Sequence, residues 1–289
     1  MKDVLSRALL CDGKVSAIAV CSTAIYKTAA MIHGCAPCAA AALGRCLTAS
    51  VLMGAGLKGK HDKLSLIVDG NGPAGKIICT VTTDGVIKGY IRNPQADLPL
   101  RYDGKLDIGG VVGRGQLTVT RDEGQPEPYV GVSELVSGEI AQDIASYYKI
   151  SQQTPSAVLL GERMGNNAAA GGMLITPMPG CDADTLTVLE NKLRSLGGIG
   201  ELVEKYESME ELLLDNFWDI GVMPLQTDAI AYHCDCSRER MEQALLSLRK
   251  GELAELAQQE TTQMKCRFCN SAYVFTAQEL LGLSGECNE

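Results

Sequence analysis

Two closely spaced cysteine pairs near the C-terminus carry the clearest chemical signal in this sequence. Cys234 and Cys236 form a CxC motif, and Cys266 and Cys269 form a CxxC motif one helix-sized segment later. Thiolate sulfur suits Zn²⁺, and a tetrahedral shell of four sulfurs at about 2.3 Å closes a structural zinc site. The spacing therefore predicts one Zn²⁺ per chain, bound by Cys234, Cys236, Cys266 and Cys269 in the reduced protein.

Other interpretations of these residues stay open. The four cysteines are alternatively unrelated buried thiols, and His233 is a candidate to replace one sulfur, although four sulfurs already complete the shell. A zinc- or thiol-dependent enzyme is disfavoured, because a closed four-sulfur shell leaves no position for substrate. The sequence also lacks HExxH, GxSxG and P-loop motifs. We therefore expect no catalytic residues and no enzymatic activity.

The chain has 12 cysteines, so most of them lie outside the two pairs. Cys35 and Cys38 form a second CxxC before an alanine-rich segment, but this resembles a redox motif only superficially. We expect small buried or half-buried thiols there. The same expectation applies to the remaining cysteines, which are Cys11, Cys21, Cys46, Cys79, Cys181 and Cys287.

The overall composition argues against several classes of partner. Lys and Arg number 26 against 35 Asp and Glu, so the formal charge of −9 opposes broad binding to nucleic-acid backbones, which needs clustered cations. Charged residues interrupt the N-terminal segment before any signal-peptide core forms. No run of 18 apolar residues predicts a membrane span. We expect a cytoplasmic protein with reduced thiols and no membrane or nucleic-acid partner.

A different functional class competes for the C-terminal segment, namely a zinc-ribbon module that binds nucleic acid or a protein partner. Glutamates of the same segment offset its basic residues, so a solvated helix face is the simpler interpretation. The basic residues are Arg238, Arg240, Arg249, Lys250, Lys265 and Arg267.

The elements that must position the cysteines begin with a mixed helix and strand region over residues 1–178. Small residues from Ala36 to Leu52 predict a buried helix, and helical spacing predicts another over Ser133–Tyr148. The glycine-rich segment Gly109–Gly115 reads as a turn between strands, and Pro177–Gly180 as a boundary. Strands are predicted at residues 64–68, 76–82, 86–91, 115–120, 156–160 and 172–176, with the second and third forming a hairpin.

Residues 179–230 read as a helical segment. One apolar stripe ends at Gly197 and Gly198, and a second runs from Ile199 to Leu213. Two amphipathic helices on a core explain these stripes, and so does a metastable module whose apolar face is exposed conditionally. Periodicity does not separate the two interpretations. The leucines of these stripes that would be exposed in the second case are Leu186, Leu189, Leu193, Leu202 and Leu213.

Several segments together resemble the 33 kDa chaperonin family of redox-regulated bacterial holdases. The most specific match is the C-terminal cysteine pattern, and the likeness extends over the rest of the chain. Cys35, Cys38 and Cys46 depart from the family pattern, and Gln259–Thr262 lacks the acidic-glycine turn expected before the CxxC. The matching segments are Cys234–Arg240 (CDCSRER), Cys266–Asn270 (CRFCN), Gly115–Asp122 (GQLTVTRD), Gln153–Val158 (QTPSAV) and Gly171–Gly180 (GGMLITPMPG).

The resemblance implies an α+β protein in three parts. An α/β core chaperone domain with two β-sheets and helices covers residues 1–178, and a metastable helical linker covers residues 179–230. A small four-cysteine zinc domain, the redox switch, covers residues 231–289. The reduced, zinc-bound protein is expected to be inactive. Oxidation would form the disulfides Cys234–Cys236 and Cys266–Cys269, release zinc, and unfold the C-terminal and linker regions.

The implied function is to bind unfolding proteins during oxidative stress and to prevent their aggregation. The implied partners are unfolded or oxidatively damaged client proteins and a second copy of the chain, in a homodimer of the activated form. ATP-dependent refolding chaperones would act downstream.

Overall fold

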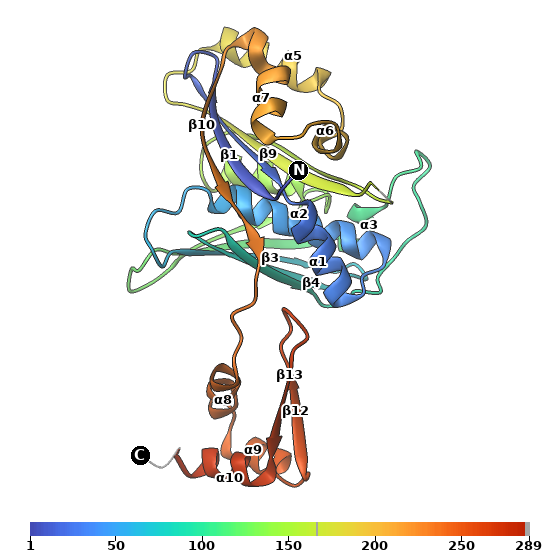
Figure 1. The fold of residues 1–289 in the computed structure, drawn as a ribbon, viewed down its shortest axis with the longest axis vertical. Coiled ribbons are helices and arrows are strands. Elements are labelled where there is room, and N and C mark those ends of the chain that lie inside the picture. The colour runs from blue at the N-terminus through green and yellow to red at the C-terminus, as the bar shows by residue number, and fades with distance from the viewer. Residues whose placement is uncertain (166, 287–289) are drawn as a thin grey trace. The chain divides into compact units, whose positions relative to one another are not determined.

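The computed structural model describes residues 1–165 and 167–286. Within them the chain is a mixed α+β protein with three sheets, and Figure 1 shows its course. The chain divides into two compact units, with the boundary between His233 and Cys234. The three-part division at residues 178 and 230 stays a prediction.

One sheet of the first unit has five antiparallel strands in the order β10-β1-β2-β9-β8. Strand β9 is buried along most of its length, because helices cover both faces of this sheet. The predicted strands at residues 156–160 and 172–176 are confirmed as β8 and β9. The strands are β1 (Val4–Leu10), β2 (Val15–Cys21), β8 (Ala157–Arg163), β9 (Ala169–Pro177) and β10 (Val222–Ala229).

The other sheet of this unit has six strands in the order β11-β5-β4-β3-β6-β7, antiparallel except for the short β11–β5 pair. Alternate residues of its strands point into the core, as Leu64, Leu66 and Val68 do in β3. The predicted hairpin is confirmed, because β4 pairs with β5. The strands are β3 (Lys63–Gly70), β4 (Lys76–Thr82), β5 (Val86–Ile91), β6 (Gly115–Asp122), β7 (Tyr129–Glu134) and β11 (Ala231–Tyr232).

Helix α2 (Pro37–Gly54) lies between the two sheets and contributes most of its residues to the core (Figure 1). A Cβ on Gly44 would lie 2.5 Å from the ring of Tyr26 in α1 (Thr23–His33), so this glycine permits the close packing of the two helices. In the described part of the chain, α2 alone is long and apolar enough to cross a membrane. However, 83% of it is buried inside the protein, as in the core helix of a soluble protein.

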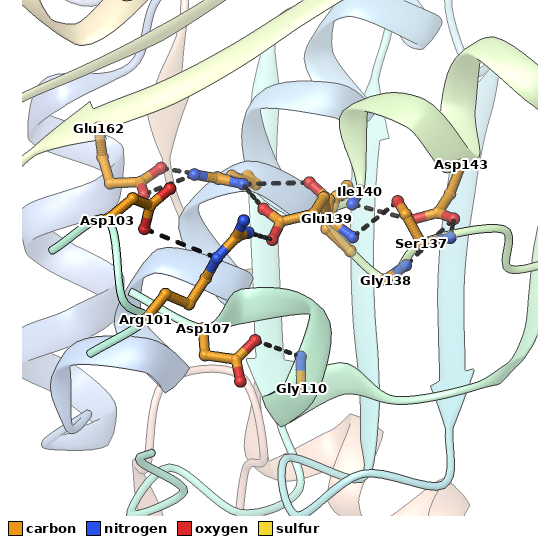
Figure 2. Close-up of polar contacts among 11 residues, drawn as sticks. Arg101, Asp103, Asp107, Gly110, Ser137, Gly138, Glu139, Ile140, Asp143 and Glu162 are labelled. Atoms are coloured by element: carbon orange, nitrogen blue, oxygen red, sulfur yellow. Dashed lines mark hydrogen bonds and ion pairs between the residues drawn. The ribbon is translucent and has the colours of Figure 1, made fainter. Parts of the chain in front are cut away.

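The predicted helix over Ser133–Tyr148 is wrong in its first half. Strand β7 continues to Glu134, a loop follows, and α4 covers only Ala141–Ile150. The buried Asp143 carboxylate holds this loop by accepting backbone N–H groups that a helix would have used (Figure 2). The donors are Val136, Ser137, Gly138 and Ile140, at 2.7 to 3.3 Å.

The glycine-rich segment Gly109–Gly115 is also corrected. It contains a five-residue helix, α3 (Ile108–Val112), where the sequence predicts only a turn. The Asp107 carboxylate caps this helix by accepting the Gly110 N–H at 2.9 Å, as Figure 2 shows. A local cap therefore nucleates one helical turn in spite of the glycines, whose conformational freedom disfavours helix.

A half-buried ion cluster ties α2 to the loop before α4 and to β8. The Arg45 guanidinium binds both carboxylate oxygens of Glu162 at 3.0 and 3.1 Å and the Glu139 carboxylate at 2.8 Å. On the solvent side, Arg101 reaches the other Glu139 oxygen at 3.1 Å (Figure 2). This cluster fixes the arrangement of three elements that are far apart in sequence.

Three helices cover the outer face of the five-stranded sheet. The stripe from Ile199 to Leu213 is not one helix as predicted, because the chain breaks after Lys205 and Ser208 caps a new helix by accepting the Glu211 N–H at 3.0 Å. Trp218–Ile220 adds a short 3₁₀ turn before β10. The helices are α5 (Ala183–Ser195), α6 (Ile199–Lys205) and α7 (Met209–Phe217).

The second unit is small and has its own thin core. Its only sheet within the described residues is the antiparallel pair β12–β13. Its buried hydrophobic side chains are Leu245, Leu253, Phe275 and Leu280. The elements are α8 (Arg238–Leu246), α9 (Lys250–Leu256), β12 (Thr261–Lys265), β13 (Ala272–Thr276) and α10 (Ala277–Glu286).

Candidate metal centre

The first cysteine pair lies immediately before helix α8. Ser237 begins that helix by accepting the Arg240 N–H at 3.3 Å. Asp235, between the two cysteines, forms an ion pair with the Arg240 side chain. A cap and an ion pair therefore fix the backbone on which Cys234 and Cys236 are carried.

The second pair occupies the tight turn between β12 and β13. The Asn270 N–H donates to the Cys266 carbonyl at 2.8 Å, and the Cys266 N–H donates to the Ser271 carbonyl at 2.9 Å. Asn270 adopts a positive φ of 59°, which asparagine tolerates better than most residues. This turn places both sulfurs of the CxxC motif on one side of the hairpin end.

The two motifs bring their four sulfurs together. All four Sγ atoms of Cys234, Cys236, Cys266 and Cys269 lie within 4.8 Å of one another. The Cys234–Cys266 sulfurs are 3.6 Å apart, and the Cys236–Cys269 sulfurs are 3.3 Å apart. A tetrahedron with Zn–S bonds of about 2.3 Å has sulfur–sulfur edges of about 3.8 Å, so the donor set fits zinc. The cluster can hold a metal ion, and its assignment to zinc stays a prediction.

The electrostatics of the cluster differ from sulfur to sulfur. Burial raises the pKa of Cys234 and of Cys266. Burial acts in the same direction on Cys269, but hydrogen bonds with Ser271 and Cys236 outweigh it and lower the pKa of Cys269 to about 7. Cys269 is thus the sulfur that ionises most readily of these three, and ionised sulfur is the form that binds metal and reacts with oxidants.

Two polar neighbours of the sulfurs were missed by the sequence reasoning. The Tyr273 hydroxyl donates to Cys236 Sγ at 3.1 Å, and the Ser271 hydroxyl lies 3.1 Å from Cys269 Sγ. The hydrogen bond with Cys236 raises the pKa of Tyr273 to about 12. The signal that points to them is their closeness in the sequence to the CxxC motif, because Ser271 follows in the turn and Tyr273 in the first half of β13.

Other residues singled out from the sequence lie outside the cluster. His233 is not a member of it and donates its backbone N–H to the Ile87 carbonyl at 3.0 Å. Cys38 is buried and Cys35 half-buried, as expected, and all cysteines within the described residues are free thiols. Cys287 lies outside the described residues. The structure thus gathers the four predicted cysteines and none of the other cysteines among residues 1–165 and 167–286.

The five leucines predicted to meet clients are covered to different degrees by the five-stranded sheet. Leu189 and Leu213 are fully buried in the cluster between the helices and that sheet. Leu193 and Leu202 pack against the same cluster and are partly buried, and Leu186 is also partly buried. In the folded form Leu189 and Leu213 therefore belong to the core of the first unit, and Leu193 and Leu202 pack at its margin.

Two of the six basic residues of the second unit, Arg238 and Arg240, are engaged by acidic partners. Arg238 forms ion pairs with Glu242 and Glu279, and its guanidinium lies 4.3 Å from the centroid of the Phe275 ring. The ion pair between Arg240 and Asp235 adds to this neutralisation. The surface is thus less suited to a phosphate backbone than the count of cations implies.

Comparison with known proteins places this arrangement in a family. A family model described as "Hsp33 protein" matches residues 3–276. The 33 kDa chaperonin of Clostridium botulinum (strain Langeland) is 42% identical over 285 residues, covering 97% of this chain and 96% of the relative. The 33 kDa chaperonin of Clostridium acetobutylicum is 43% identical over 286 residues, with the same coverage.

A solved structure gives the same result for the fold. The crystal structure of the 33 kDa chaperonin (heat shock protein 33 homolog) of Thermotoga maritima superposes with a TM-score of 0.90 and 30% identity, covering 99% of each chain. The family is one of chaperones and not a class of enzymes. With a near-complete sequence match, a shared fold and a four-cysteine cluster, the chain belongs to the 33 kDa chaperonin (Hsp33) family.

Proposed function

We propose that this protein is a redox-regulated holdase that is inactive when reduced and metal-bound and binds unfolding proteins after oxidation. The observation that carries the proposal is the gathering of four cysteine sulfurs within 4.8 Å in a unit with only a thin hydrophobic core. Such a unit depends on its cysteines for folding, so chemistry at sulfur controls its stability.

Cys234, Cys236, Cys266 and Cys269 would hold the metal. Zn²⁺ bound there would keep the four sulfurs as thiolates and add about 10 kcal/mol or more to the folding of the unit. The Tyr273 hydroxyl and Ser271 would orient two of the sulfurs through their hydrogen bonds. The residues present therefore suit a structural site and leave no position open to substrate.

Hydrogen peroxide is the oxidant class that this chemistry fits. A thiolate attacks one peroxide oxygen, giving a sulfenic acid and hydroxide, which takes up a proton to become water. A second thiol then attacks the sulfenic sulfur, and the sulfenic hydroxyl leaves with the proton of that thiol as a second water, which forms the disulfide. Each pair loses two electrons and peroxide gains them. We propose the products Cys234–Cys236 and Cys266–Cys269, because residues adjacent in sequence stay close once the unit begins to unfold.

Loss of the thiolate donors would unfold the second unit and destabilise the helices α5 to α7. Their release would expose Leu186, Leu189, Leu193, Leu202 and Leu213, together with the sheet face that these residues now cover. An apolar surface of this kind retains unfolded chains. Reduction of the disulfides would reset the protein.

The wider assignment follows the family. Clients would be unfolded or oxidatively damaged proteins in the cytoplasm, held by a homodimer of the activated form. They would pass later to ATP-dependent refolding chaperones.

Light scattering from a chemically denatured model client tests the proposal. The zinc-loaded, reduced chain should leave aggregation unchanged, and the peroxide-treated chain should suppress it. Cys266→Ser should abolish the dependence on oxidation, whereas Cys181→Ser, which alters a half-exposed thiol outside the cluster, should behave as wild type. A zinc-sensitive dye should record release of about one metal per chain with four ligands.

Two outcomes would contradict the proposal. One is equal suppression by the reduced and oxidised chains. The other is a gel shift with single-stranded or duplex nucleic acid by the reduced chain and no effect on the client, which would favour the zinc-ribbon binding module.

A further inference from the structure

Strand β10 is the least buried strand of the five-stranded sheet. It lies at the edge of that sheet and pairs only with β1 (Figure 1). Most of its side chains are exposed, including Met223 at 53% and Leu225 at 56%. Side-chain burial therefore contributes little to holding β10, and its backbone hydrogen bonds carry most of the attachment.

The pairing of β10 with β1 is also irregular. The register shifts between Ser6 and Ala8, so the ladder is interrupted at Arg7. Pro224 lies in the strand and has no N–H to donate. Two side-chain contacts remain near the C-terminal end, a 2.8 Å hydrogen bond between Ser6 and Thr227 and an ion pair between Arg7 and Asp228.

A cavity of about 390 Å³ lies beside this same end of the strand. Its lining includes Arg7 and Leu5 from β1 and Gln226, Asp228 and Ile230 from the β10 region. The strand therefore makes few protein contacts on this side, and it lacks the close packing that holds the buried strands of the sheet. Local opening therefore requires less free energy here than in the close-packed centre of the sheet.

The position of β10 in the chain connects it to both parts that the proposed switch would unfold. Helix α7 and a short 3₁₀ turn precede it, and residues 230–233 alone separate it from Cys234. If α5 to α7 leave the sheet and the second unit unfolds, the two-residue strand β11, which pairs with β5, is the one neighbour in the sequence that still anchors β10.

Strand β1 is held quite differently. It pairs with β2 in an unbroken register over its whole length, and its alternate side chains are buried in the core. Departure of β10 would therefore leave β1 in place with a row of unpaired N–H and C=O groups. Such an edge binds extended chains through main-chain hydrogen bonds, with little demand on side-chain sequence.

We propose that β10 is a removable strand and that the edge of β1 which it covers binds extended segments of unfolded clients by strand addition. The proposal rests on the holdase function proposed above and names its binding mode. The sheet ends β8 and β7 are edges in the folded form as well, so they do not distinguish the two states. Strand β11 covers β5 over two residues only, whereas β10 covers β1 along most of its length, so β1 offers the longer edge that is closed in the folded state and opened by its partial loss.

A disulfide staple between β1 and β10 tests this mode. The side chains of Ser6 and Thr227 face each other at 2.8 Å, so the double variant Ser6→Cys with Thr227→Cys places two sulfurs to form a cross-strand disulfide under the same peroxide treatment. Ser6→Cys and Thr227→Cys alone are matched controls. We expect the stapled chain to oxidise its four C-terminal cysteines normally, by peptide mass mapping, yet to lose about tenfold or more in client affinity.

The outcomes separate the two proposals. Suppression of aggregation by the stapled chain as strong as that of the single variants would overturn strand addition and leave the holdase intact. Failure of the oxidised single variants and of wild type to suppress aggregation would instead remove the holdase function itself.

A labelled peptide with the β10 sequence VMPLQTDA provides a measurement that does not depend on the staple. It should bind the oxidised full-length chain, compete with the client, and show no binding to the reduced chain. The matched control is the same peptide with N-methyl groups on the amides facing β1, which keeps every side chain but removes main-chain donors. Equal binding of both peptides would show that side chains, and not a strand edge, make the contact, and would contradict the proposal.

Discussion

At the scale of single residues, the stability of the first unit depends on a few polar groups that are largely buried. Arg45 is one, because its guanidinium satisfies the Glu162 carboxylate, whose side chain is only 7% exposed. Removing one partner of a buried ion pair leaves an uncompensated charge, which costs far more than the loss of an exposed pair.

Arg45→Met should therefore lower the free energy of unfolding of the first unit by about 3 kcal/mol or more. The matched control is Arg194→Met, which removes a pair with Glu190 in which both side chains are mostly exposed, and should change it by less than about 1 kcal/mol. Urea unfolding of the reduced chain, followed by far-UV circular dichroism, measures both. Equal effects of the two variants would mean that the cluster is not stabilising.

His33 provides a pH-dependent prediction. Burial lowers the pKa of His33 below its ordinary value of 6.5, and its imidazole hydrogen-bonds to the Gly89 carbonyl at 3.0 Å. The folded state therefore favours the neutral ring, while the unfolded state takes up a proton first as pH falls. Stability from this residue is present above about pH 6.5 and is lost on acidification toward the folded pKa.

His33→Gln keeps an N–H donor for the Gly89 carbonyl and has no titration in this range. The urea midpoint of wild type should fall more than that of the variant between about pH 7.5 and about pH 5. Parallel decreases would exclude a contribution of His33.

At the scale of elements, the sequence predicts the helices and strands that follow from local apolar patterns. It fails where a single polar side chain determines the end of a helix or the course of a loop. Helix α2 and the β4–β5 hairpin follow from apolar spacing and turn residues. The loop after β7 does not, because the helical spacing there is overruled by the Asp143 carboxylate. The break before α7 was missed because Ser208 caps a new helix within a continuous apolar stripe.

Asp143 makes this explanation testable. Asp143→Ala should leave several buried backbone donors without a partner and destabilise the first unit by about 3 kcal/mol or more. Asp143→Asn keeps one acceptor oxygen and should recover part of the loss. Urea unfolding measures the change in stability, and amide exchange over residues 135–140 measures the protection of the loop. An unchanged exchange rate in Asp143→Ala would show that the loop conformation does not depend on this carboxylate.

At the scale of the whole molecule, the four cysteines were predictable as a set because two closely spaced pairs are the pattern of a four-cysteine metal site. Their geometry was not, since the closest sulfurs belong to different motifs, Cys234 with Cys266 and Cys236 with Cys269. The packing of α5 to α7 on the five-stranded sheet was also not predictable, because an apolar stripe does not indicate which surface it packs against.

Removal of bound metal should destabilise the second unit and leave the stability of the first unit unchanged. A strong zinc chelator under reducing conditions should remove amide-exchange protection from α8 to α10 while β3 to β6 keep theirs, because only the second unit lacks a large core. Calorimetry should record the loss of one transition. A matching loss of protection in the central sheet would mean that the chain unfolds as one cooperative body.

Helix α2 sets the limit to which such a protein can open. It is the one described helix with the apolarity of a membrane span, and the two sheets together with helix α1 shield it from solvent. A chain that exposed the 18 mostly apolar residues of α2 would itself aggregate together with the proteins that it is proposed to hold. Durable activation therefore requires that unfolding of the second unit and of α5 to α7 does not spread to α2. The unbroken β1–β2 ladder is placed to stop that spread.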